Sequence, residues 1–336
     1  MRGASRADPV SRRPPRTLNV ALAVLVLAAG AVVLATSLLG KDDRGSSTVS
    51  TSASASRSEQ LAEGRDGQAF FPSDLERSFA RFARTQPGRV DLALAPLGRG
   101  PVRRLGSKFA GHAWSAMKVP LLVALLREAG GPTGLSPAQR RQAEAALTRS
   151  DNDAAIALFD ELQRRRGGRN GASAAIERVL RRAGDNATKV NTLPNDEGFT
   201  TFGQTRWSAT QATRFFRALA RGCLLDREGT GYVLRTMRDV VADQRWGLGD
   251  AGLPTGTRVA LKGGWGPEQR DAYLVRQSGI VGSGATGYVL TIVARPTGRG
   301  EASFATGREM NSAAARWIRG ALGAVRPQPP APCARS

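Results

Sequence analysis

The stretch that decides the fold is GHAWSAMKVPLLVALLREAG, residues 111–130. Its second half is an apolar run that predicts a buried helix, yet Ser115 and Lys118 stand at its start. Residues three apart on a helix share a face, so we expect the hydroxyl and the amine to point together. A lysine beside an apolar wall loses hydration, and its pKa falls towards that of a usable base. The pair therefore predicts a serine nucleophile activated by an amine.

The chain offers little else for catalysis or metal binding. His112 is its only histidine, and neither Cys223 nor Cys333 has the spacing of a zinc ligand. This composition argues against a metal site and against a Ser-His-Asp triad, and we expect no cofactor. The two cysteines leave two possibilities open, a single disulfide or two unrelated thiols.

Two further motifs follow the serine and the lysine. TRSDNDAAIALF (148–159) places Ser150, Asp151 and Asn152 at a break between predicted helices, where such residues are also common caps. VALKGGWGP (259–267) places Lys262 before two glycines, which either end a strand or let a substrate approach the backbone.

In this order, SAMK, SDN and KGG resemble the three motifs of the serine β-lactamase and penicillin-binding protein superfamily, and most nearly those of class A β-lactamases. The resemblance spans residues 72–325. It implies an α/β (α+β) fold in which an antiparallel sheet flanked by helices adjoins a helical subdomain. The active site is then expected in the cleft between the two.

The resemblance also implies roles for the catalytic residues. Ser115 resembles the nucleophile that opens a β-lactam or an acyl-D-alanine amide, and Lys118 resembles the base that takes its proton. Ser150 matches the residue that passes a proton to the leaving nitrogen. The expected reaction is therefore amide hydrolysis through a serine acyl-enzyme.

The same resemblance implies a set of substrate-binding residues. Asn152 would hold the substrate's side-chain amide, and Lys262 would face its carboxylate and tune Ser150. Gly263 and Gly264 belong to the same motif, and the backbone N–H of Trp265 would complete an oxyanion hole with that of Ser115.

Three departures from the family pattern bear on activity. Gly263 stands where the family has a hydroxyl residue, and no E-x-x-L-N loop occurs, Glu197 being the only glutamate of the corresponding region. Only 35 residues separate Ser115 from Ser150, which predicts a trimmed helical subdomain. We therefore expect acylation with slow deacylation; the alternative is a catalytically impaired cell-envelope binding module with the same fold.

Periodicity and turn residues predict the order of elements. Helices are expected over 72–86, from 115, from 137, over 151–162, over 208–222 and over 307–325. Strands are expected over 89–98, 257–264, 271–281 and 286–295, with a weaker hairpin partner over 101–111.

The N-terminal part predicts a membrane anchor. The expected segments are a basic cytoplasmic tail (1–17), a transmembrane signal anchor (18–40), a Ser/Thr-rich linker (41–67), the hydrolase domain (68–325) and a Pro-rich tail (326–336). The run from Val20 to Leu39 is free of charge and long enough to cross a bilayer. The expected location is the cell membrane, single-pass, with the domain outside; the alternative is secretion after signal cleavage.

The net charge of +21 arises from 44 arginines and only five lysines. These arginines are scattered without interleaved aromatic residues, so we expect no nucleic-acid partner. The expected partners are a β-lactam or peptidoglycan peptide and the membrane, and the expected state is a monomer.

Overall fold

The segments predicted as strands build one antiparallel sheet of five strands. The computed structural model describes residues 70–193, 199–268, 272–322 and 327–333, so the predicted tail, anchor and linker lie outside it. The sheet has the order β2-β1-β7-β6-β5. Its strands are β1 (Gly88–Pro96), β2 (Arg103–Leu105), β5 (Val259–Pro267), β6 (Tyr273–Val281) and β7 (Tyr288–Pro296). The predicted antiparallel sheet is thus confirmed, with β5 at one edge.

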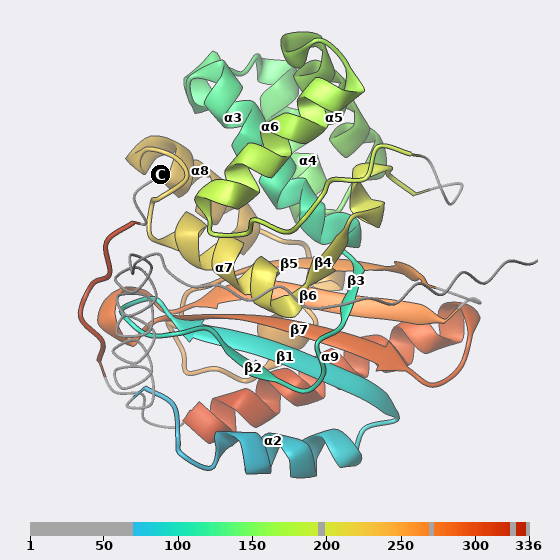
Figure 1. Ribbon diagram of the computed structural model, residues 1–336, viewed down its shortest axis with the longest axis vertical. Coiled ribbons are helices and arrows are strands. Elements are labelled where there is room, and N and C mark those ends of the chain that lie inside the picture. Colours follow the sequence, from blue (N-terminus) through green and yellow to red (C-terminus); the bar gives the residue numbers. More distant parts are fainter. Residues whose placement is uncertain (1–69, 194–198, 269–271, 323–326, 334–336) are drawn as a thin grey trace, which may run out of the picture. The chain divides into compact units, whose positions relative to one another are not determined.

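Two helices cover one face of the sheet (Figure 1). They are α2 (Leu75–Arg84) and α9 (Gly300–Leu322), and Trp317 of α9 packs against Phe79 and Phe82 of α2. The predicted start of the last helix, residue 307, was wrong by about two turns. Gly307 does not mark the start of the helix. It lets the helix pack closely against β6, because a Cβ at this position would lie 2.4 Å from Val275 Cγ2.

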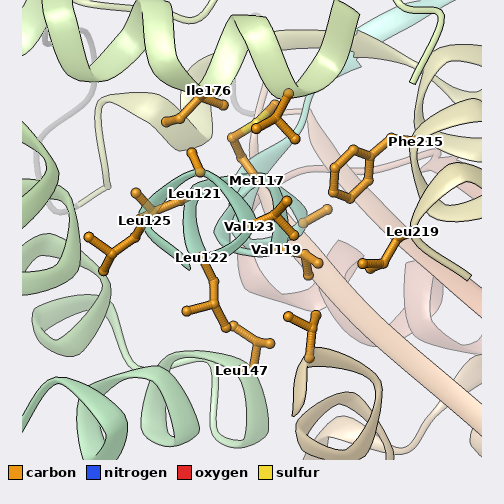
Figure 2. Close-up of a cluster of buried hydrophobic side chains, with 14 of the residues drawn as sticks. Met117, Val119, Leu121, Leu122, Val123, Leu125, Leu147, Ile176, Phe215 and Leu219 are labelled. Carbon is orange, nitrogen blue, oxygen red and sulfur yellow. The ribbon is translucent and has the colours of Figure 1, made fainter. Parts of the chain in front are cut away.

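The opposite face carries α7 (Ala209–Ala220) and the helical subdomain (Figure 1). The subdomain contains α3 (Lys118–Ala129), α4 (Pro137–Thr148), α5 (Asn152–Arg166), α6 (Arg169–Arg182) and α8 (Arg227–Arg238). Every residue of α3 from Lys118 to Leu126 is buried, and its apolar side chains meet α4, α6 and α7 (Figure 2). The apolar run quoted above therefore forms the centre of the larger core.

The predicted hairpin partner over 101–111 is divided in two. Residues 103–105 pair with β1, whereas β3 (Ala110–His112) leaves the sheet and pairs with β4 (Arg206–Ser208). The chain turns away at Gly106, whose φ of 92° suits glycine, and the Asp91 carboxylate accepts a hydrogen bond from Ser107 N at 2.5 Å. This separate ribbon leads directly into the serine of the first motif.

Short 3-10 turns connect the longer elements. They are η1 (Trp114–Met117), η2 (Pro132–Gly134), η3 (Phe202–Gln204), η4 (Ala242–Gln244), η5 (Gly247–Asp250) and η7 (Gly284–Thr286). Within the described ranges, no helix is long and apolar enough to span a membrane.

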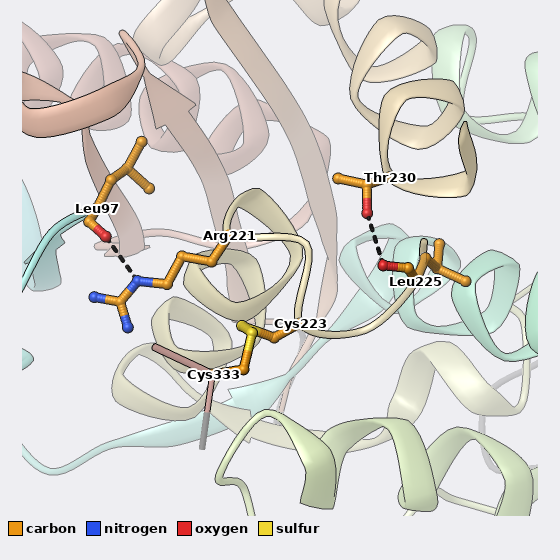
Figure 3. The surroundings of a disulfide bond; sticks show 6 residues. All are labelled: Leu97, Arg221, Cys223, Leu225, Thr230 and Cys333. Atoms are coloured by element: carbon orange, nitrogen blue, oxygen red, sulfur yellow. Dashed lines mark hydrogen bonds between the residues drawn. A yellow bond between two sulfur atoms is a disulfide. The ribbon is translucent and has the colours of Figure 1, made fainter. Parts of the chain in front are cut away.

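A disulfide joins Cys223, just after α7, to Cys333 in the C-terminal tail (Figure 3). The tail also pairs through its backbone, since Arg99 N donates to Pro329 O and Gln328 N donates to Ala285 O. Of the two possibilities that the sequence left open, the structure shows the paired cysteines.

Replacing Cys333 by Ser is expected to lower the free energy of unfolding by about 2–4 kcal/mol, because the bridge constrains the unfolded chain over a separation of 110 residues. Denaturant unfolding of wild type and variant measures the difference. Reduced wild type serves as the control and should match the variant; equal midpoints for oxidised wild type and variant would contradict the expectation.

Candidate active site

Ser115 lies in a 3-10 turn and not in an α-helix. The turn η1 spans Trp114–Met117, and α3 begins only at Lys118. The expectation of one continuous helix was therefore wrong at this point, but residues i and i+3 eclipse each other in a 3-10 turn, so the shared face remains. Trp114, just before the serine, has a φ of 48°. A bulky residue in this region is strained, and such strain gathers at functional sites.

Two polar side chains, Arg276 and Glu268, bind the chain that enters the turn. Arg276, fully buried on β6, donates from Nη1 to His112 O at 3.2 Å and to Trp207 O at 2.9 Å. Glu268 Oε1 accepts from His112 N at 2.7 Å. These hydrogen bonds engage both the N–H and the C=O of His112 and hold the β3–β4 ribbon in place. They thereby position the turn that carries Ser115.

The amine of Lys118 is enclosed by the second motif. The residue is 1% exposed, and Nζ donates to Ser150 O at 2.5 Å, Asp151 O at 3.2 Å and Asn152 Oδ1 at 2.8 Å. Among the described residues, none of its hydrogen bonds goes to Ser115. Burial lowers the pKa of Lys118 to about 7, against the opposing attraction of Asp151. A large fraction of this lysine is therefore neutral at neutral pH and has a lone pair to offer.

The SDN motif caps a helix and includes a residue with a strained backbone. Asp151 caps α5, since its Oδ1 accepts from Ala154 N at 2.8 Å. Ser150, immediately before it, has a φ of 61°. Ser150 and Trp114 are the only residues other than glycine with positive φ in the described part of the chain, and both flank the same cavity.

The third motif completes the polar cluster from the edge strand. Lys262 is 1% exposed, and its Nζ donates to Ser150 Oγ at 2.8 Å and to Gly263 O at 3.1 Å. Burial, with the charge of Lys118 as a second cause, sets the pKa of Lys262 well below its usual value. Ser150 thus lies between two buried amines, one bound to its carbonyl and one to its hydroxyl.

Both glycines of KGG are sites of close approach. A Cβ on Gly264 would lie 3.0 Å from Ser115 N and 2.7 Å from Ala113 O, so only glycine lets β5 reach the nucleophile turn. A Cβ on Gly263 would lie 2.6 Å from Cζ2 of the buried Trp246. The space that a hydroxyl residue would need at this position is taken by the indole ring.

A cavity of about 140 Å³ opens over this cluster. Four of the predicted site residues line it: Ser115, Ser150, Asn152 and Trp265. The lysines and glycines of the motifs are buried. The sequence reasoning missed the other lining residues, which are Trp114, Arg149, Phe199, Thr200 and Gln244. Only Arg149 and Trp114 could have been found from the sequence, because each directly precedes a serine of a motif.

The comparison with protein families agrees with this arrangement. Residues 131–316, more than half of the chain, match the beta-lactamase enzyme family. The chain belongs to this family. The matched region contains the second and third motifs, while Ser115 and Lys118 precede it. A search of curated proteins gave no match.

Solved structures show the same fold. The β-lactamase from Streptosporangium roseum is 18% identical, with a TM-score of 0.57 over 74% of this chain and 98% of that one. A class A β-lactamase from Mycobacterium abscessus is 19% identical, with a TM-score of 0.57 over 74% and 99%. A β-lactamase from Desulfarculus baarsii is 23% identical, with a TM-score of 0.55 over 74% and 97%. The fold is thus that of class A β-lactamases.

Replacing Gly263 by Thr, which restores a hydroxyl to the motif, is expected to destabilise the protein by about 1–3 kcal/mol, because the new Cβ overlaps Trp246. Thermal or denaturant unfolding measures the loss. In a double-mutant cycle, the same change in a Trp246→Phe background should cost less, since the smaller ring vacates the overlap. An equal cost in both backgrounds would contradict the assigned contact.

Proposed function

We propose that the protein is an extracytoplasmic serine hydrolase that is acylated at Ser115 by β-lactams or D-alanyl peptides and deacylates slowly. The observation that carries this proposal is the buried amine of Lys118, which lies three residues after Ser115. The SDN turn holds this amine through hydrogen bonds. A low-pKa amine within reach of a hydroxyl would be a nucleophile-activating pair that needs no histidine.

The proposed acylation step involves proton transfers between residues of all three motifs. Ser115 Oγ forms a bond to the substrate carbonyl carbon and gives its proton to neutral Lys118. The carbon–nitrogen bond then breaks, and the leaving nitrogen takes the proton of the Ser150 hydroxyl. The ammonium form of Lys262, whose Nζ lies 2.8 Å from Ser150 Oγ, can return a proton to that oxygen. The backbone N–H groups of Ser115 and Trp265 are the proposed donors to the oxyanion.

The cavity supports acylation better than hydrolysis of the acyl-enzyme. Hydrolysis needs a group that activates water, and no carboxylate is among the cavity-lining residues that the structure describes. Glu197, the only glutamate of the region that corresponds to the family's E-x-x-L-N loop, lies outside the described residues. Slow deacylation is therefore part of the proposal.

The disulfide supports the proposed location. Disulfides persist in oxidising compartments outside the cytoplasm, and Cys223 and Cys333 are the chain's only cysteines. The charge-free run from Val20 to Leu39 is the proposed means by which the domain is exported and held at the membrane.

Acylation by a fluorescent penicillin is expected to rise with pH through about 7 and then level off, because Lys118 must be neutral to accept the proton of Ser115. Initial labelling rates between about pH 5 and pH 9 measure the profile. Lys118→Arg should abolish labelling over this range, because a guanidinium keeps its proton. Labelling of Ser115→Ala as strong as that of wild type would overturn the proposal.

The covalent adduct is expected to outlast removal of free β-lactam, because the described cavity has no water-activating carboxylate. Intact-protein mass spectrometry after rapid desalting follows the added mass with time. Ser115→Ala is the control and should gain no mass. Loss of the adduct as fast as it forms would contradict slow deacylation, and wild type that never gains mass would favour the binding-module alternative.

A further inference from the structure

A second cavity, of about 380 Å³, lies between the end of α8, the turn η5 and the start of β5. It shares no lining residue with the cavity at Ser115. Three arginines from three segments of the chain line it: Arg238 ends α8, Arg245 follows η4, and Arg258 directly precedes β5. Its described lining contains no aspartate or glutamate, so this is a cationic hollow away from the candidate active site.

The three guanidinium groups lack acidic partners. Arg245 Nη1 donates to Arg238 O at 3.4 Å, and none of the three side chains makes an ion pair with any residue that the structure describes. Arg238 and Arg258 together also line a further cavity of about 100 Å³, so these two side chains lie close to each other. Like charges that meet at one hollow repel one another, and an anion placed between them removes that repulsion.

A structural role accounts for only part of this arrangement. Arg238 lies in the last turn of α8, where a cation stabilises the helix dipole, and Arg245 donates to a carbonyl of the same turn. Neither reason applies to Arg258, which lies outside the helices and whose side chain makes no hydrogen bond within the described chain. Thr257 adds a hydroxyl to the same wall. Arg258 is therefore available to a ligand, beside two further cations.

We propose that this cavity is a binding site for a multiply charged phosphate group. A guanidinium can donate two parallel hydrogen bonds to phosphate oxygens, and such charge-assisted bonds are the strong ones. Three cations match a group with two or more negative charges better than they match a single carboxylate. A volume of about 380 Å³ is within the range of small-molecule sites. The assignment does not depend on the proposed hydrolase activity.

The choice of variants follows from the position of the three arginines. Arg245 stands between Gln244, which lines the cavity at Ser115, and Trp246, which contacts Gly263 of the third motif. Its replacement could therefore disturb both cavities. Arg258 has neither neighbour and is exposed, so its replacement changes the phosphate site alone.

Isothermal titration calorimetry of the full chain with pyrophosphate, in a neutral detergent, measures the dissociation constant. Arg258→Gln is expected to raise this constant by about 10-fold, because a charged donor is lost, and Arg238→Gln should have a similar effect. Arg258→Lys should retain part of the affinity, since the charge remains without the planar fork. Arg235→Gln is the matched control: it removes the same charge from an exposed position of α8 that does not line the cavity, and it should leave the constant nearly unchanged.

Several results would overturn the assignment. Wild type that does not bind pyrophosphate, or that binds it no more tightly than Arg258→Gln does, would remove the site. Equal losses in Arg235→Gln and Arg258→Gln would show attraction by net charge alone. A loss confined to Arg149→Gln would place pyrophosphate in the cavity at Ser115, which Arg149 lines. Thermal unfolding separates loss of the site from loss of the fold: pyrophosphate should raise the midpoint of wild type and not that of Arg258→Gln, with equal midpoints when no ligand is present.

Two smaller probes distinguish the sources of the phosphate. Equal dissociation constants for inorganic phosphate and glycerol 3-phosphate would support a free phosphate as the ligand. Tighter binding of glycerol 3-phosphate would support a phosphate group carried by a larger molecule. In both cases Arg258→Gln should weaken binding, and binding that is independent of Arg258 would contradict the proposal.

Discussion

Burial of the Lys118 amine is the constraint on which the site depends. The lysine begins α3, whose apolar side chains form the centre of the larger core, so its ammonium form cannot be hydrated. Three oxygen acceptors of the SDN turn favour the charged form, while burial favours the neutral one. The balance at a pKa of about 7 leaves the amine able to take up and release a proton. The same helix therefore stabilises the fold and holds the proposed base.

Backbone strain and glycine contacts belong to the same arrangement. Trp114 and Ser150 adopt positive φ, each at a cost of about 1–3 kcal/mol that the surrounding packing must offset. Gly264 lets the edge strand approach Ser115 N, and Arg276 and Glu268 hold the entering ribbon. The site thus consists of three segments that hold one another in place through these contacts, as the proposed catalysis requires.

Much of the fold could be predicted, because the order of helices and strands follows from periodicity and caps. Helix α6 was missed because its N-cap residue, Gly168, has no side chain to cap it, and α8 because it contains Gly229 and Gly231. The three motifs were found from local sequence. The place of Gln244 in the cavity wall could not be predicted from local sequence, because it depends on the packing of η4 against the distant end of α4. Likewise, glycine is required at position 263 because the ring of Trp246, 17 residues earlier in the chain, leaves no room for a side chain there.

The central claim is that Lys118 is neutral over much of the physiological pH range. Its most direct test is a pH titration followed by NMR of the side-chain ¹³Cε atoms, which is simple in a chain with only five lysines. The Lys118 signal is assigned by its disappearance in Lys118→Ala. The account predicts that it titrates with a midpoint near 7. A Lys118 signal that stays in the ammonium form up to about pH 10, as for an ordinary exposed lysine, would contradict the account.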